Sequence, residues 1–149
     1  MASTTAAGTG LAISAGIPAT QDAAGYGALT YTEIGQVEQL GAFGATQEVV
    51  NFQPLKGPLQ KYKGPNNSGA IQPSLAHDDS DAGQTLLRTA AANATSALYA
   101  FRVTYPDNSK RFFQGRVFGY PENVGAANTM LMANPSIEIS SDVIKAAAS

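Results

Sequence analysis

One short stretch of the sequence gathers the residue types that perform acid–base or metal chemistry. His77 is the only histidine of the chain, and Asp78, Asp79 and Asp81 follow it closely. Imidazole and carboxylate groups are common ligands of divalent cations. The stretch lacks the Asp-x-Asp-x-Asp-Gly order of a calcium loop, however, and carboxylates directly before a helix also serve as N-caps. We interpret these acids as helix caps, with metal binding as the alternative.

The sequence carries none of the common catalytic motifs. A Ser-His-Asp centre would need His77 as its base, and no Gly-x-Ser-x-Gly turn accompanies it. Glycine-rich phosphate loops are absent, and a chain without cysteine has no thiolate nucleophile. Its 11 Asp and Glu residues would allow a carboxylate pair for glycoside hydrolysis, but no pair stands out. We therefore expect no catalytic residue, cofactor, metal or enzymatic activity.

The element that follows the acidic stretch has the pattern of a helix. Asp81 is placed to cap it, and Gln84 stands three residues later, as in a capping box. Apolar residues recur at helical spacing and predict a packing surface: Leu86, Leu87, Ala90, Ala91 and Ala94. The sequence thus predicts one flanking α-helix over about residues 82–94.

Most of the remaining chain has the pattern of antiparallel strands. Residues 99–105 alternate apolar and polar, residues 106–109 supply turn chemistry, and residues 110–120 return as the partner strand, with Gly115 at a bulge or a close backbone approach. Further strands are expected near these ranges: 31–34, 45–52, 70–76, 128–133 and 136–140. Glycine and proline in residues 11–31 favour extended pieces joined by turns, and an alanine-rich tail is expected to fray.

Residues 53–69 form the most unusual segment. They include three Pro, three Gly and three Lys but no acidic residue. Proline removes strand hydrogen bonds and glycine weakens strands, so we predict a long inter-strand loop. Loops above about 12–15 residues are usually functional or disordered. Leu55, Leu59 and Tyr62 favour an interaction loop, since they give it apolar surface to bury.

The predicted elements define an α+β, mainly β, fold. A single helix would flank an antiparallel β-sandwich or barrel formed by residues 10–149. Residues 1–9 are small and polar, which indicates a flexible N-terminal arm that orders against a partner, or a disordered tail.

Composition indicates a chain with few charges. Charged residues make up 13% of the sequence and hydrophobic residues 44%, where soluble domains carry about 25% charge. Such a surface suggests coverage by partners; a neutral monomer is the alternative. The net charge of −2 excludes the basic footprint of a sequence-reading nucleic-acid binder. No signal peptide or membrane span is evident, so we expect synthesis in the cytoplasm and no membrane association.

Several phrases, taken in order, resemble one protein family. They are Gly10-Leu-Ala-Ile-Ser14, Thr30-Tyr-Thr-Glu-Ile-Gly-Gln-Val37, Asp81-Ala-Gly-Gln-Thr-Leu-Leu87, Tyr99-Ala-Phe-Arg-Val-Thr-Tyr-Pro-Asp107 and Arg111-Phe-Phe-Gln-Gly-Arg-Val117. In this order the chain resembles the tail tube (major tail) proteins of long-tailed bacteriophages and related gene transfer agents. The resemblance covers most of residues 10–140 and rests on short hydrophobic phrases, without a catalytic signature.

The resemblance implies a structural role in a virion tail. Six copies would close edge to edge into a ring, and rings would stack into a hollow tube that passes double-stranded DNA without specific binding. Ring closure removes exposed sheet edges, and a repeated head-to-tail contact propagates a filament. The family also implies contacts with a tape-measure protein and tail-end proteins, and production in the cytoplasm of a bacterial host.

The resemblance also implies roles for particular residues. The residues expected to join successive rings are Leu55, Lys56, Leu59, Lys61, Tyr62 and Lys63. The acidic surface that we pair with them is Asp78, Asp79 and Asp81. The candidates that face the lumen are Glu33, Glu48 and Glu138, because acidic groups would let DNA slide past.

Two other classes remain open. A secretion-system tube or a tail terminator would share the ring architecture. A β-sandwich module that binds carbohydrate or protein would use exposed aromatics: Tyr99, Phe101, Tyr105, Phe112 and Phe113. Their alternation favours a buried face instead.

Overall fold

The β8–β9 hairpin forms the centre of the computed structural model, which describes residues 3–147. Strand β8 (Tyr99–Thr104) pairs antiparallel with β9 (Lys110–Gly119). The turn between them is held by the Asp107 carboxylate, which accepts hydrogen bonds from the Ser109 amide at 3.0 Å and hydroxyl at 2.6 Å. These bonds hold the pKa of Asp107 below its usual value. The hairpin predicted from the alternation of residues 99–105, the turn at 106–109 and the partner strand at 110–120 is confirmed.

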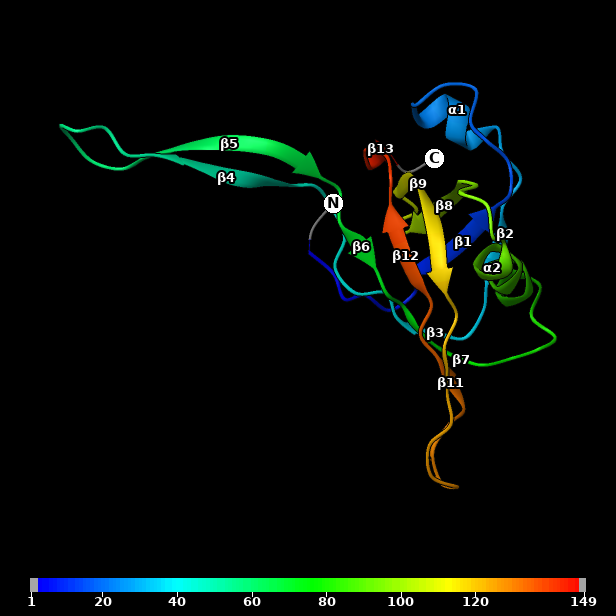
Figure 1. Cartoon of the computed structure of the whole chain (residues 1–149). Coiled ribbons are helices and arrows are strands. Elements are labelled where there is room, and N and C mark those ends of the chain that lie inside the picture. Colours follow the sequence, from blue (N-terminus) through cyan, green and yellow to red (C-terminus); the bar gives the residue numbers. More distant parts are fainter. Residues whose placement is uncertain (1–2, 148–149) are drawn as a thin grey trace.

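The hairpin lies in the middle of a seven-stranded antiparallel sheet. The order along it is β2 (Thr32–Ile34), β1 (Gly10–Ser14), β8, β9, β12 (Ser136–Ile139) and β6 (Ala70–Ile71). Strand β13 (Ile144–Ala146) also pairs with β9. Gly115 of β9 is a close approach, since an added Cβ would lie 2.7 Å from the Glu138 carbonyl oxygen. Figure 1 shows β9 and β12 crossing the centre of the molecule.

One face of the sheet buries the main hydrophobic core. The strands contribute Leu11, Ile13, Phe101, Val103, Phe113 and Ile137, all fully buried. A smaller four-stranded sheet has the order β10 (Glu122–Asn123), β11 (Met132–Ala133), β7 (Ser74–Ala76) and β3 (Val37–Gln39). It contributes Leu75 and Ala133 to this core. The mainly β, antiparallel α+β fold is confirmed, and four of the five aromatics considered above are buried, with Tyr105 half-buried.

Helix α2 (Ala82–Ala92) covers part of the same core with Leu87 and Ala90. Asp81 caps it by accepting a hydrogen bond from the Gln84 amide at 2.9 Å, as the sequence indicated. The capping box is wrong, because the Gln84 side chain turns inward. It donates to the carbonyls of Gly35 and Ala76 at 2.9 Å each, which ties the helix to the strands. Buried amides are stable only when their hydrogen bonds are satisfied in this way.

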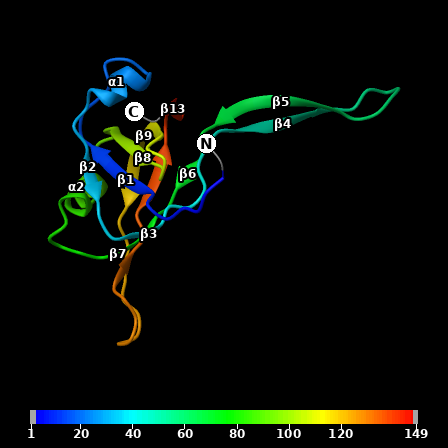
Figure 2. The same ribbon diagram turned by 180° about the vertical axis from the view of Figure 1, so that it is seen from behind.

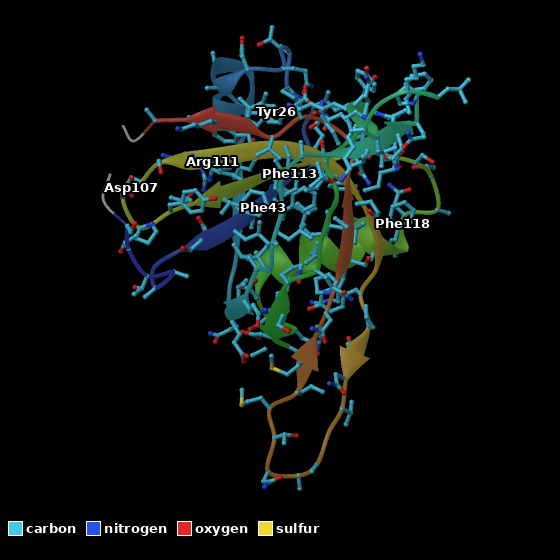
Figure 3. The ribbon with its side chains drawn as sticks, turned by 90° about the vertical axis from the view of Figure 1, so that its left-hand side faces the viewer. Tyr26, Phe43, Asp107, Arg111, Phe113 and Phe118 are labelled. Carbon is cyan, nitrogen blue, oxygen red and sulfur yellow. The ribbon has the colours of Figure 1, made fainter. Side chains whose placement is uncertain are left out.

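The opposite face of the large sheet carries a second, smaller core. Helix α1 (Ala23–Gly27) places Tyr26 in a stacked arrangement on Phe112, with ring centroids 5.5 Å apart. Burial raises the pKa of the Tyr26 hydroxyl, which hydrogen-bonds the side chain of Gln21 at 2.9 Å. Figure 3 shows Tyr26 beside β13 and β9 on this side of the sheet. The prediction that residues 11–31 contain only extended pieces is wrong, because helix α1 lies among them. Asp22 caps this helix by accepting a hydrogen bond from the Gly25 amide.

The predicted loop over residues 53–69 is confirmed for residues 53–59, which connect two strands, and wrong for residues 60–67, which form a strand. Strand β4 (Thr46–Phe52) and strand β5 (Gln60–Asn67) form a separate antiparallel ribbon, and only residues 53–59 connect them. Pro54, Gly57 and Pro58 lie in the connection, while Gly64 and Pro65 fall where the register shifts at a bulge. A ribbon with no third strand needs no amide donor at that position, so proline does not break it.

Three smaller expectations are also corrected. Residues 128–131 are not in a strand, and the turn over residues 126–129 is closed by Thr129, whose amide and hydroxyl donate to the Ala126 carbonyl. Residues 70–76 split into β6 and β7 around Pro73. The tail expected to fray pairs with β9 through β13 as far as Ala146, and residues 148 and 149 lie outside the described part. Residues 3–9 of the expected arm are described, with Gly8 close to Pro106, and residues 1 and 2 lie outside the described part.

We expect Gly83→Ala to destabilise the fold. An added Cβ would lie 2.1 Å from the carbonyl oxygen of Glu33 in β2, so α2 and β2 would have to separate. Overpacking of this kind costs about 1–3 kcal/mol or more in the free energy of unfolding. Chemical denaturation checks this, with Gly27→Ala as the control, because nothing lies within 4 Å of a Cβ added there. Equal unfolding midpoints for both variants would contradict the packing of α2 on β2.

Candidate functional site

The acidic stretch is divided among structural roles. Asp81 caps α2 and also accepts a hydrogen bond from the Gly35 amide at 3.1 Å. Asp78 accepts bonds from the amide and hydroxyl of Ser80, which lower its pKa, the hydroxyl bond contributing most. Asp79 is different, because 85% of its side chain is exposed. Asp79 is therefore the member of the stretch with a carboxylate most open to a partner.

His77 is enclosed by groups that hold it in place. Its Nε2 lies 2.9 Å from Asp79 Oδ1, and its Nδ1 lies 3.8 Å from Glu122 Oε1. The imidazole packs edge-on against Tyr120, and the Arg88 guanidinium lies over that tyrosine ring. Burial raises the pKa of the Tyr120 hydroxyl. Among the described residues, no group of three His, Asp or Glu side chains is arranged to hold a metal ion.

The β4–β5 ribbon, called here the β4–β5 arm (residues 46–67), projects from the body of the molecule. Figures 1 and 2 show it extending to one side, well clear of both sheets. Every residue of β4 is exposed, and in the connection Leu55 is fully exposed. A monomeric protein rarely leaves a continuous apolar surface uncovered. The arm therefore has the properties of an unoccupied interaction surface.

The register of the β4–β5 arm separates its side chains into two faces. Val50 lies opposite Tyr62 and Phe52 opposite Gln60, so one face is apolar and aromatic. On the other face Val49 lies opposite Lys63, and Asn51 opposite Lys61. The six residues expected to join rings all lie in this arm or its tip: Leu55, Lys56, Leu59, Lys61, Tyr62 and Lys63.

The three lumen candidates do not share one surface. Alternation along the paired strands puts Glu33 and Glu138 on the same face of the large sheet, the face that also carries Arg102 and Arg116. Arg102 Nη2 contacts Glu33 Oε1 at 3.2 Å. Glu48 lies on the β4–β5 arm instead. The face thus has mixed charge, and the lumen assignment stays a prediction.

A second projection was missed by the sequence reasoning. The segment from Pro121 to Asn134, called here the β10–β11 arm, extends below the large sheet in Figure 1. It exposes Val124, Met130 and Leu131. The signal that could have found it is a run of 14 residues with Glu122 as the one charged residue and apolar side chains in a stretch expected to turn.

The described residues define a mainly β domain with two apolar arms, and neither helix is long and apolar enough to cross a membrane. No protein-family model matches the chain, and a search of curated proteins gives no match. Among solved structures, the fold is similar to a chain in the six-fold symmetrised cryo-EM structure of the anti-feeding prophage (AFP) baseplate. The TM-score is 0.66, the alignment covers 96% of this chain and 95% of that chain, and 8% of residues are identical. The chain therefore shares the fold of a component of that assembly.

Proposed function

We propose that this chain is a structural subunit of a phage-type tail, which assembles with copies of itself into stacked rings that form a hollow tube. The observation that carries the proposal is the β4–β5 arm. Its apolar face has no cover within its own chain among the described residues, so a partner must supply it. The fold shared with a chain of a six-fold symmetrised baseplate supports assembly into rings, and six subunits per ring is the number we propose.

The placement of the arm supports a head-to-tail contact. In Figures 1 and 2 the β4–β5 arm and α2 lie on opposite sides of the molecule. A contact between two different surfaces of one protein generates a ring when its rotation closes and a filament when it does not. The same chain can therefore use one contact within a ring and another between rings.

In this role the chain needs no cofactor and performs no catalysis. Double-stranded DNA would pass through the lumen without specific contacts, and the net charge of −2 suits passage better than retention. The protein would reside in the tail of a particle assembled in a bacterial host, next to tape-measure and tail-end proteins.

A second candidate is a ring component of a baseplate, which the fold similarity favours directly. Such a subunit would form a ring or part of one but would not add further rings indefinitely. Assembly length therefore separates the two candidates, because only a tube subunit repeats its axial contact.

Negative-stain electron microscopy of the purified chain at rising concentration tests the proposal. We expect hollow tubes of stacked rings whose number and length grow with concentration. Single rings that never lengthen would favour the baseplate component. A chain that remains monomeric at every concentration would contradict both candidates.

A further inference from the structure

The exposed large hydrophobic side chains of the described residues are concentrated on the two arms. Six lie on the β4–β5 arm and three on the β10–β11 arm. The other two are Ile17 and Phe118. The two arms are therefore the main apolar surfaces that a second copy of the chain could cover.

The two arms cannot cover each other within one chain. Figures 1 and 2 show the β4–β5 arm leaving one side of the body and the β10–β11 arm leaving its lower end. The surface that covers each arm must therefore belong to another molecule.

Hydrogen bonds hold the β10–β11 arm in a defined shape before a partner binds. Its base is closed by the Asn134 amide, which donates to the Pro121 carbonyl at 3.0 Å, and by the His77 amide, which donates to the Leu131 carbonyl at 2.8 Å. Its tip is closed by the turn at Thr129. A preformed surface loses little conformational entropy when it binds.

Charge favours a contact between unlike arms. The β4–β5 arm carries Lys56, Lys61 and Lys63 against a single acid, Glu48. At the base of the β10–β11 arm, Glu122 and Asp79 flank His77, and their side chains are 47% and 85% exposed. Pairing two β4–β5 arms would bring six lysines together, whereas pairing unlike arms sets lysines against carboxylates.

We propose that the β4–β5 arm of one copy docks on the β10–β11 arm of a second copy, with Lys61 and Lys63 facing Glu122 and Asp79. Val49, which is exposed on the same face of the arm as the two lysines, then covers Val124. This inference rests on the proposed function, since it names the surface that receives the arm during assembly. It also keeps one acid of the expected docking surface, Asp79, and adds Glu122, which the sequence reasoning did not select.

Cross-linking between single-cysteine variants tests the contact, because the chain has no cysteine of its own. Asn51→Cys lies beside Lys61 on the β4–β5 arm, and Asn123→Cys lies beside Glu122, so neither removes an apolar contact. The two variants, one carrying a size tag, are mixed at assembling concentration with a short bis-maleimide. Ile17→Cys is the control, since it is exposed and lies outside both arms.

We expect the Asn51→Cys and Asn123→Cys pair to cross-link about tenfold faster, or more, than either variant with Ile17→Cys, because residues in contact react at a raised effective concentration. Charge reversal by Lys61→Glu with Lys63→Glu should remove this preference, and Glu122→Lys in the second chain should restore part of it. Tubes or rings that form without preferred cross-linking of this pair would overturn the inference and leave the proposed function standing. Absence of both assembly and preferred cross-linking would overturn both.

Discussion

Replacing Phe113 with alanine is expected to lower the free energy of unfolding by about 3–5 kcal/mol, the range for deleting a buried aromatic ring. Phe113 is fully buried in the main core. Its ring stacks on Phe101 with the ring centroids 5.4 Å apart. The ring of Phe43 is tilted against it, with the centroids 6.0 Å apart. Figure 3 shows Phe43 and Phe113 together near the middle of the molecule. The substitution would leave a cavity and remove the packing contact between β9 and the segment that carries Phe43.

Urea denaturation followed by circular dichroism measures this loss. Phe118→Ala is the matched control, because it removes the same side chain from the same strand where 66% of it is exposed. Surface substitutions usually change stability by about 0.5 kcal/mol or less. Since domains are stable by only about 5–15 kcal/mol, Phe113→Ala should leave a much smaller margin. A similar effect of both substitutions would show that the two faces of β9 are not buried as described.

The double substitution Val50→Asp with Phe52→Asp is expected to weaken assembly strongly while leaving the fold intact. Both residues lie on the apolar face of the β4–β5 arm and are about half exposed in the single chain, so the body of the protein does not depend on them. Burying a large apolar side chain contributes about 1.5–3 kcal/mol. Each 1.4 kcal/mol changes an association constant about tenfold, so the concentration needed for assembly should rise by about a hundredfold or more.

Sedimentation across a concentration series measures this assembly threshold, and thermal unfolding reports on the fold. Ile17→Asp serves as the control, since it places the same charge on an exposed apolar residue outside both arms. Its threshold should match that of the unmodified chain. Tubes formed by the double variant at an unchanged threshold would contradict the role of the arm.

The sequence predicts the centre of the fold better than its projections. The alternation of residues 99–105, the turn residues 106–109 and Gly115 within the returning strand make the hairpin, its turn and the close backbone approach foreseeable. The Asp81 cap is likewise local and was predicted. In the β4–β5 arm, β4 was predicted but β5 was not, because Gly64 and Pro65 argue against a strand unless the bulge that accommodates them is already known.

The candidate surface can be predicted from the sequence only where its residues form a local pattern. Leu55, Tyr62 and the lysines of the β4–β5 arm stand out in a segment without acids, whatever its backbone does. Glu122 does not, because its place beside His77 depends on pairing between β11 and β7, which lie far apart in the chain. Contacts that depend on such distant pairing leave no local pattern in the sequence.

The bulge at Gly64 and Pro65 bears on how an unassembled chain stays dispersed. A flat two-stranded ribbon with free edges is a template for uncontrolled stacking with its own kind, as in amyloid. Proline supplies no amide donor to an approaching edge, the bulge twists the ribbon, and Lys61 and Lys63 repel a second copy laid alongside. These features oppose edge-to-edge aggregation of the β4–β5 arm. Single chains therefore stay available for ordered assembly.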